Sequence, residues 1–350
     1  MNDKGRKRGM ERNGSAERNG GTERNGDMKW KGITERNLEL GVQLYTVRDF
    51  LEPVHTLAGT LRKIREIGYD AVEFFGLRGI SGAGWRELLG ECGLRPCGVH
   101  ALWEEIDGDL GFYIDHLKQL RCENLVIALS KDVDFESCKQ VLRFAESLEA
   151  AGKVCRENGI NLVYHNHNHE FLPVRGDRGE VCKGNGAGLA HHNHEFLPVG
   201  DEKGKACRED GAGLARHNHE CLPVRGGSTG MEMLLENIPA DCLRFELDIY
   251  QIHLAGVYFP ELCGKYKGRL ELLHIKDCAP GDPIRPGFPM RRIICTYPGG
   301  GNLNLPLFSR AAVAAGCRRF VVELDEIRAD GDPFHALSLS YEYLKQELFL

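Results

Sequence analysis

Residues 304–326 have the sequence NLPLFSRAAVAAGCRRFVVELDE. In the first half, apolar residues recur at helical spacing, and Gly316 follows at a position where helices commonly end. The second half, 319–324, is a short run of apolar β-branched and aromatic residues, which is typical of a buried strand. Glu323 lies near the end of this run. The stretch therefore predicts a helix that leads into a strand, which is one unit of an alternating α/β fold.

The same alternation extends through the chain from Leu38 onward. Several helical segments end in a glycine that is followed by an apolar residue, as at Gly68. Eight such units in about 310 residues, with strands apolar on both faces, predict a parallel (β/α)8 barrel. A doubly wound open sheet is the alternative, but it usually has a glycine-rich phosphate loop after its first strand, and TVRD follows here at 46–49. The predicted strands are 40–45, 71–75, 95–100, 124–129, 161–165, 243–248, 270–275 and 319–324. The predicted helices are about 54–67, 84–92, 109–120, 135–158, 230–238, 258–267, 304–316 and 333–348.

Composition and charge argue against a nucleic-acid-binding, membrane-spanning or secreted protein. The 350 residues include 45 Lys and Arg against 51 Asp and Glu, a net charge of -6. A protein with this negative net charge repels a polyanion weakly, so we expect no nucleic acid partner. No run reaches the roughly 18 to 20 apolar residues of a membrane helix, and the N-terminus is charged where a secretory signal is apolar. We therefore expect a cytoplasmic protein that does not enter the membrane, and the 13 Cys without a CxxC pair fit reduced core thiols.

Residues 1–37 stand apart from the alternating pattern. They repeat the unit Glu-Arg-Asn, starting at Glu11, Glu17, Glu23 and Glu35, and have almost no residue that could enter a core. We expect a disordered low-complexity tail here, followed by a single barrel domain at 38–350.

A second segment interrupts the barrel pattern. The sequence HNHEFLPV at 167–174 recurs at 192–199 and, with Cys for Phe, at 217–224, so the period is 25 residues. The extra copies predict an inserted His- and Gly-rich loop at about 175–224. Two interpretations are open. The loop is either a tandem duplication without a function of its own or a metal-collecting segment, since eight of the 14 His lie between His165 and His219.

Polar residues follow the last four predicted strands at the end where such a barrel has its active site. Strand five runs into YHNHNHE at 164–170, and strands six, seven and eight end in FELD at 245–248, LHIKD at 273–277 and VELDE at 322–326. Neighbouring strand ends would bring these carboxylates and imidazoles together. Mixed oxygen and nitrogen ligands of this kind suit a divalent metal ion.

Five motifs, in this order, resemble the sugar phosphate isomerase/epimerase family, whose fold is a xylose isomerase-like TIM barrel. The resemblance covers about 38–350 apart from the inserted repeats. It implies one divalent metal ion, manganese, cobalt, magnesium or zinc. The motifs are GVQLYTVRD at 41–49, YHNH at 164–167, FELDIY at 245–250, LLHIKD at 272–277 and VELDE at 322–326. The metal ligands that the resemblance implies are Glu170, Asp248, His274 and Glu323.

The sequence departs from the family at two points. The family usually has Gly-Glu-Gly-Asn before its seventh helix, whereas 299–302 read Gly-Gly-Gly-Asn and lack the carboxylate. The fifth-strand ligand has competitors, because Glu195 and Glu220 occupy near-identical repeats and other subfamilies place the ligand where His165 stands. We expect Glu170, because only the first repeat copy follows an apolar strand that can hold it rigidly.

Other polar residues at the predicted barrel mouth are candidates for binding the substrate. Lys276 lies two residues after His274 and projects to the same side, so it could neutralise an enediolate or a phosphate, or be a surface lysine. Glu73 and His100 end strands two and three and could bind sugar hydroxyls, or be packed core groups. His167 is the fourth candidate.

These residues predict a metal-dependent isomerase or epimerase of a sugar or sugar phosphate, working through a metal-stabilised enediolate. Glu323 would act as one member of an acid/base pair, and Glu170 or His165 as the other. An inosose-type dehydratase on the same scaffold is the alternative, as is a barrel that binds metal or sugar without catalysis. The expected partner is a small sugar or polyol-ketone, and homo-oligomerisation stays open.

Overall fold

The computed structural model describes residues 38–52, 56–176, 228–326 and 331–349. The expected tail at 1–37 and almost all of the predicted insertion at 175–224 lie outside these residues. Within the described part, ten cysteines are free thiols, and nine of these are buried. No helix there is long and apolar enough to cross a membrane.

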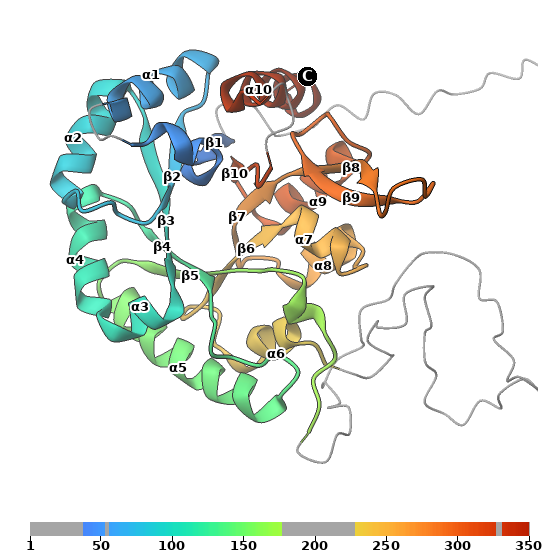
Figure 1. Ribbon diagram of the computed structural model, residues 1–350. Coiled ribbons are helices and arrows are strands. Elements are labelled where there is room, and N and C mark those ends of the chain that lie inside the picture. The colour runs from blue at the N-terminus through green and yellow to red at the C-terminus, as the bar shows by residue number, and fades with distance from the viewer. Residues whose placement is uncertain (1–37, 53–55, 177–227, 327–330, 350) are drawn as a thin grey trace, which may run out of the picture. The chain divides into compact units, whose positions relative to one another are not determined.

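Eight parallel strands close into a barrel, as predicted (Figure 1). The last barrel strand, β10, pairs with the first, β1, through partners such as Leu40 and Phe320. This pairing excludes the open sheet. Four predicted strands have the observed bounds, and the other four differ by one or two residues at one or both ends. The barrel strands are β1 Glu39–Gln43, β2 Ala71–Phe75, β3 Arg95–Leu102, β4 Asn124–Leu129, β5 Asn161–His165, β6 Arg244–Asp248, β7 Leu270–Ile275 and β10 Arg319–Val322.

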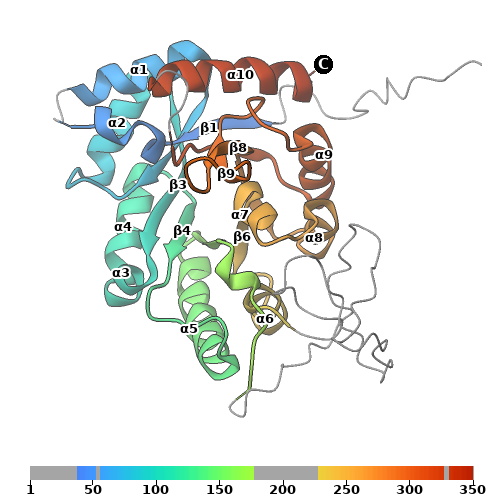
Figure 2. The same ribbon diagram turned by 45° about the vertical axis from the view of Figure 1, so that its right-hand side comes forward.

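Helices surround the barrel, and α10 lies beside α1 where the ring of helices closes (Figures 1 and 2). The glycines that were predicted to end helices do so. Gly68 and Gly316 cap α1 and α9 with φ of 126° and 111°, a region that favours glycine. The helices are α1 Leu57–Ile67, α2 Gly82–Cys92, α3 Trp103–Gly108, α4 Leu110–Leu120, α5 Cys138–Glu157, α6 Gly230–Asn237, α7 Ile249–Leu254, α8 Phe259–Lys265, α9 Leu305–Ala315 and α10 Pro333–Phe349.

An apolar layer fills the barrel interior below its C-terminal end. Small and medium side chains from six strands make this layer. On four of these strands the residue two positions later is polar, and because side chains alternate along a strand, it points to the same interior. These polar side chains therefore lie on the C-terminal side of the apolar layer. The members of the apolar layer are Ala71, Cys97, Val126, Val163, Leu272 and Val321.

A hairpin that the sequence did not predict follows β7 directly. Its strands, β8 Asp277–Pro283 and β9 Arg291–Thr296, pair in antiparallel fashion. Asp277, at its base, is buried and accepts backbone hydrogen bonds that tie the hairpin to the glycine-rich turn at 299–301. That turn therefore encloses a carboxylate of its own chain. The donors are the N–H groups of Cys278, Gly299, Gly301 and Leu303, at 2.8–3.1 Å from the Asp277 oxygens.

Candidate metal centre

Polar side chains from six barrel strands meet inside the C-terminal end of the barrel. They lie at two levels, because Glu246 and Asp248 are two residues apart on β6 and both point inward. All are buried, with at most 9% of any residue exposed. We call the level nearer the opening the mouth group, His165, Asp248, His274 and Glu323. We call the deeper level the inner group, Glu73, His100 and Glu246.

The mouth group has the donor set of a divalent metal site. One ligand atom from each of its four residues lies within 4.8 Å of the others. His274 Nδ1 is 2.9 Å from Glu323 Oε2. His274 Nδ1 and Asp248 Oδ2 are fully buried, and their close contacts are with charged groups of the site and lack hydrogen-bond geometry. Two nitrogen and two oxygen ligands around one buried point fit a first-row ion such as zinc or manganese.

Lys276 places a cation beside the mouth group. Its Nζ lies 2.9 Å from Asp248 Oδ2, 2.7 Å from Glu323 Oε2 and 3.0 Å from Asp325 Oδ2. Burial favours the neutral amine, but these carboxylates outweigh it and raise the pKa of Lys276 well above its usual value. Burial likewise opposes ionisation of Glu323, yet Lys276 and His274 hold the pKa of Glu323 well below its usual value. Glu323 is therefore an ionised carboxylate.

The structure brings His165, and not Glu170, together with Asp248, His274 and Glu323. His165 is the last residue of β5 and points inward, whereas Tyr164 points outward, toward Phe135 and Phe144. Glu170 follows in a short 3-10 helix, His169–Phe171, and turns back to the outward side. Of the two alternatives for the fifth strand, the structure therefore groups His165 with the other three predicted ligands and places Glu170 apart from them.

Glu170 belongs to a separate cluster with His167 and His169. Its Oε1 accepts a hydrogen bond from the Tyr164 hydroxyl at 3.0 Å, and its Oε2 accepts one from the backbone N–H of His167 at 2.8 Å. Burial alone would raise the pKa of Glu170, but His167 and His169 lower it. These contacts give Glu170 a role in holding the loop after β5. The competing residues Glu195 and Glu220 lie outside the described residues.

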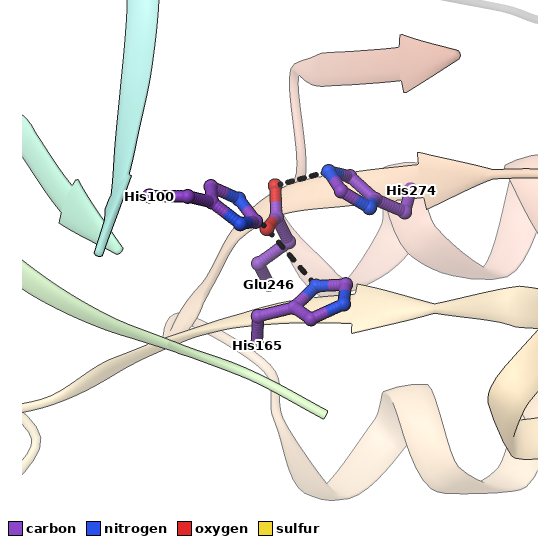
Figure 3. Close-up of side chains that lie close together, drawn as sticks. All are labelled: His100, His165, Glu246 and His274. Carbon is purple, nitrogen blue, oxygen red and sulfur yellow. Dashed lines mark hydrogen bonds and ion pairs between the residues drawn. The ribbon is translucent and has the colours of Figure 1, made fainter. Parts of the chain in front are cut away.

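The inner group is a compact network of carboxylates and imidazoles. Figure 3 shows one of its carboxylates, Glu246, among His100 and the two mouth-group imidazoles, His165 and His274. Glu246 Oε2 lies 2.9 Å from His100 Nε2 and 3.1 Å from His165 Nδ1. Glu73 Oε2 lies 2.6 Å from His274 Nε2 and 3.0 Å from His100 Nε2. The inner group therefore contacts both imidazoles of the mouth group from below.

Charge in this network is balanced within the barrel. Burial lowers the pKa of His100, but Glu73 and Glu246 outweigh burial and raise it to about 10. Burial opposes ionisation of Glu246, yet His274 and His100 hold the pKa of Glu246 well below its usual value. His165 differs, because burial is the largest influence on it and lowers its pKa. His165 is thus the neutral imidazole of the set.

The other predicted binding residues lie at different depths. Lys276 reaches the mouth group, whereas Glu73 and His100 lie below it. His167 is partly exposed, with its ring centroid 5.1 Å from that of His165. Sequence reasoning assigned no role to Glu246, although its position two residues before Asp248 on a strand was the available signal.

Comparison with known proteins supports the fold. No protein-family model matches the chain, and no curated protein matches it in sequence. A sugar phosphate isomerase/epimerase from Parabacteroides distasonis has a similar structure, with a TM-score of 0.62 and 20% identity over 88% of this chain and 94% of that one. A xylose isomerase-like TIM barrel protein from Mycobacterium smegmatis, in complex with magnesium, has a TM-score of 0.58 and 15% identity over 91% and 98%. L-ribulose 3-epimerase has a TM-score of 0.57 and 12% identity over 89% and 94%.

These similarities confirm the xylose isomerase-like TIM barrel that the five sequence motifs implied. At 12–20% identity they establish the fold alone. The chemistry has to be argued from the site.

Proposed function

We propose that this protein is a divalent metal-dependent isomerase or epimerase of a sugar or sugar phosphate. The observation that carries the proposal is the mouth group, in which four strand ends present two imidazoles and two carboxylates around one buried point. The structural neighbours include an epimerase of a sugar and a sugar phosphate isomerase/epimerase. They make this reaction class the first to test.

His165, Asp248, His274 and Glu323 would hold the ion. When bound, the ion would act as a Lewis acid on a carbonyl oxygen and so acidify the neighbouring C–H. Isomerisation and epimerisation then both need a base that removes this proton and an acid that returns it.

Glu323 is the base in this proposal. Its pKa is held low, so it is ionised at neutral pH, and it lies at the C-terminal edge of the barrel where a substrate enters. His165, at the end of β5, has a lowered pKa and is the neutral imidazole that a metal ion needs as a ligand. Lys276, fixed beside Glu323, supplies positive charge for a substrate oxygen or phosphate.

Deuterium exchange tests the assignment of the base. The protein, loaded with manganese, is incubated in heavy water with a panel of ketoses, ketose phosphates and inososes. We expect deuterium at the carbon next to the carbonyl, together with an isomer or epimer. Glu323→Gln keeps the size of the side chain and an oxygen ligand but removes the base, so exchange should fall by about two to four orders of magnitude.

Asp325→Asn is the matched control, because it also neutralises a carboxylate on Lys276 but leaves the mouth group intact. Its exchange rate should fall less than tenfold. A metal-saturated Glu323→Gln protein that exchanges at the wild-type rate would show that Glu323 is not the base. A dehydrated product from an inosose, without an isomer from any ketose, would point to a dehydratase.

A further inference from the structure

Each imidazole of the mouth group is contacted from below by a buried carboxylate. His274 Nε2 lies 2.6 Å from Glu73 Oε2 and 3.2 Å from Glu246 Oε1, while its Nδ1 faces Glu323. His165 Nδ1 lies 3.1 Å from Glu246 Oε2. In both rings, the inner group engages one particular nitrogen, Nε2 of His274 and Nδ1 of His165.

We propose that Glu73 and Glu246 are positioning residues that fix the tautomers of His274 and His165. They make Nδ1 of His274 and Nε2 of His165 the nitrogens that bind the metal ion. This inference rests on the proposed function, because it assumes that the mouth group holds a metal.

The reason is the donor and acceptor inventory of the two groups. An ionised carboxylate can only accept hydrogen bonds, and a neutral imidazole has one N–H donor and one nitrogen with an electron pair. The nitrogen that faces the inner group therefore carries the proton, because Glu323, which faces Nδ1 of His274, would itself bind the ion. The opposite nitrogen is left with the electron pair that a metal needs, and the carboxylate makes it a stronger ligand.

Both carboxylates are themselves held in place. Glu73 is fully buried, and Gln43 Nε2 donates a hydrogen bond to its Oε2 at 2.9 Å. A Cβ atom at Gly98 would lie 2.4 Å from Glu73 Oε1, so only glycine leaves room for this carboxylate. His100 Nε2 lies within 3.0 Å of both Glu73 and Glu246 and links them. Such support is what a positioning residue requires.

A second ion, held by His100, Glu246 and the two mouth-group imidazoles, is the competing interpretation, because these four residues also present ligand atoms within 4.8 Å of one another. That ion would take Nε2 of His274 and Nδ1 of His165. With the mouth group also occupied, each ring would bind an ion through both nitrogens, and the neutral imidazole would have to give up its one N–H proton, which it does not do readily. The positioning role requires only that His165 and His274 are neutral imidazoles when the metal ion is bound.

The wild-type protein permits a direct test by long-range ¹H–¹⁵N NMR of its histidine rings in the zinc-loaded form. We expect zinc on Nδ1 with a proton on Nε2 for His274, and zinc on Nε2 with a proton on Nδ1 for His165. Zinc on the opposite nitrogen of either ring would overturn the proposal. This measurement requires no variant to fold.

Metal affinity in variants gives the second test. Zinc binding to Glu73→Gln and Glu246→Gln is measured by competition with a chromophoric chelator, and the number of ions per chain by elemental analysis. We expect binding of one ion in each, weakened by about 10- to 100-fold relative to wild type. The matched control is Glu271→Gln, which neutralises a β7 carboxylate that pairs with Arg244 and Arg319. Its zinc affinity should stay within about twofold.

Folding and function are read separately from affinity. The melting temperature of each metal-free variant reports any loss of stability. If Glu73 and Glu246 had only a structural role, the variants would melt at a lower temperature, but their zinc affinity well below that temperature would not change. Unchanged affinity in both Gln variants would overturn the positioning role, and so would two ions in wild type with one lost in Glu246→Gln. Weakened affinity in a protein that turns over no sugar would contradict the proposed function alone.

Discussion

At the scale of single residues, the barrel mouth depends on buried charges that neutralise one another. Lys276 is 2% exposed and lies within 3.0 Å of three carboxylates. His100 does the same one level deeper, between Glu73 and Glu246. Removing one member of such a set leaves an uncompensated charge in the core, which is costly. Residues that form the site are therefore also residues on which stability depends.

His100 makes this stability depend on pH. Its pKa is about 10 in the folded protein, because Glu73 and Glu246 outweigh burial, against about 6.5 for an ordinary histidine. A group whose pKa rises on folding stabilises the protein fully below its unfolded pKa, and the stabilisation is lost as pH rises through the folded pKa. We therefore expect the free energy of unfolding of the metal-free protein to fall between pH 6.5 and about 10.

Urea unfolding in the presence of a chelator measures this decline. His100→Gln retains a polar side chain but does not titrate, so its decline over the same pH range should be smaller than in wild type. His274, which lies over His100 at 5.4 Å between ring centroids, has a raised pKa as well and should leave part of the decline in place. A decline of equal size in the variant would contradict the role of His100.

At the scale of elements, the strands were the part of the molecule that could be predicted. Their apolar runs have both faces buried, and the glycines that end helices mark where each strand starts, as at Gly316. The hairpin β8–β9 was missed, because β8 contains Asp277, Pro280 and Pro283 and reads as a loop. Pairing with β9 and the hydrogen bonds to Asp277 form this hairpin, and neither is visible in a local pattern.

The sequence could predict which strand ends form the site, but not which of their side chains contact one another. The alternation of inward and outward residues places His165 in the barrel and leaves Glu170 outside it, yet family position had favoured Glu170. Glu246 was quoted within a motif without a role, because its contacts with His100 and His165 come from strands far apart in sequence. Such contacts depend on closure of the barrel.

Asp277 should stabilise the hairpin and the turn at 299–301 as one unit. Its carboxylate accepts four backbone hydrogen bonds, so Asp277→Ala should lower the free energy of unfolding by about 1–3 kcal/mol. Urea unfolding measures the loss, and amide exchange at Gly299, Gly301 and Leu303 should become faster. Asp115→Ala, at an exposed helix position, should change stability by less than about 0.5 kcal/mol. Equal stability of the two variants would show that Asp277 does not hold the unit together.

At the scale of the whole molecule, the barrel is closed without the inserted repeats. Val174 and Ser228, on either side of the insertion, are already joined by a backbone hydrogen bond of 2.9 Å, and Pro173 pairs with Thr229. Arg175 belongs to the barrel, since its backbone groups pair with Glu136 and Cys138. We propose that the repeats are an insertion that the barrel domain does not need for folding.

Deletion of residues 177–226 tests this proposal. It joins Gly176 to Gly227 and recreates the sequence Val-Arg-Gly-Gly-Ser that stands at 224–228, where the third repeat copy ends. The three residues left between Val174 and Ser228 include two glycines, which suits a hairpin turn. We expect a cooperative unfolding transition by circular dichroism with a midpoint close to that of wild type. Insoluble or molten material would show that the repeats pack into the barrel.

The central claim is that rigid strand ends, and not the His-rich repeats, hold the metal ion. Metal content per chain after dialysis tests it most directly, in wild type, in the deletion variant and in Asp248→Ser. Asp248 caps α7 by accepting a hydrogen bond from the backbone N–H of Gln251. Serine keeps an oxygen that can accept this bond, but it removes the carboxylate from the mouth group. We expect one divalent ion in wild type, one in the deletion variant and almost none in Asp248→Ser. A full complement in Asp248→Ser, with loss of the ion on deletion, would place the metal on the repeats and contradict the claim.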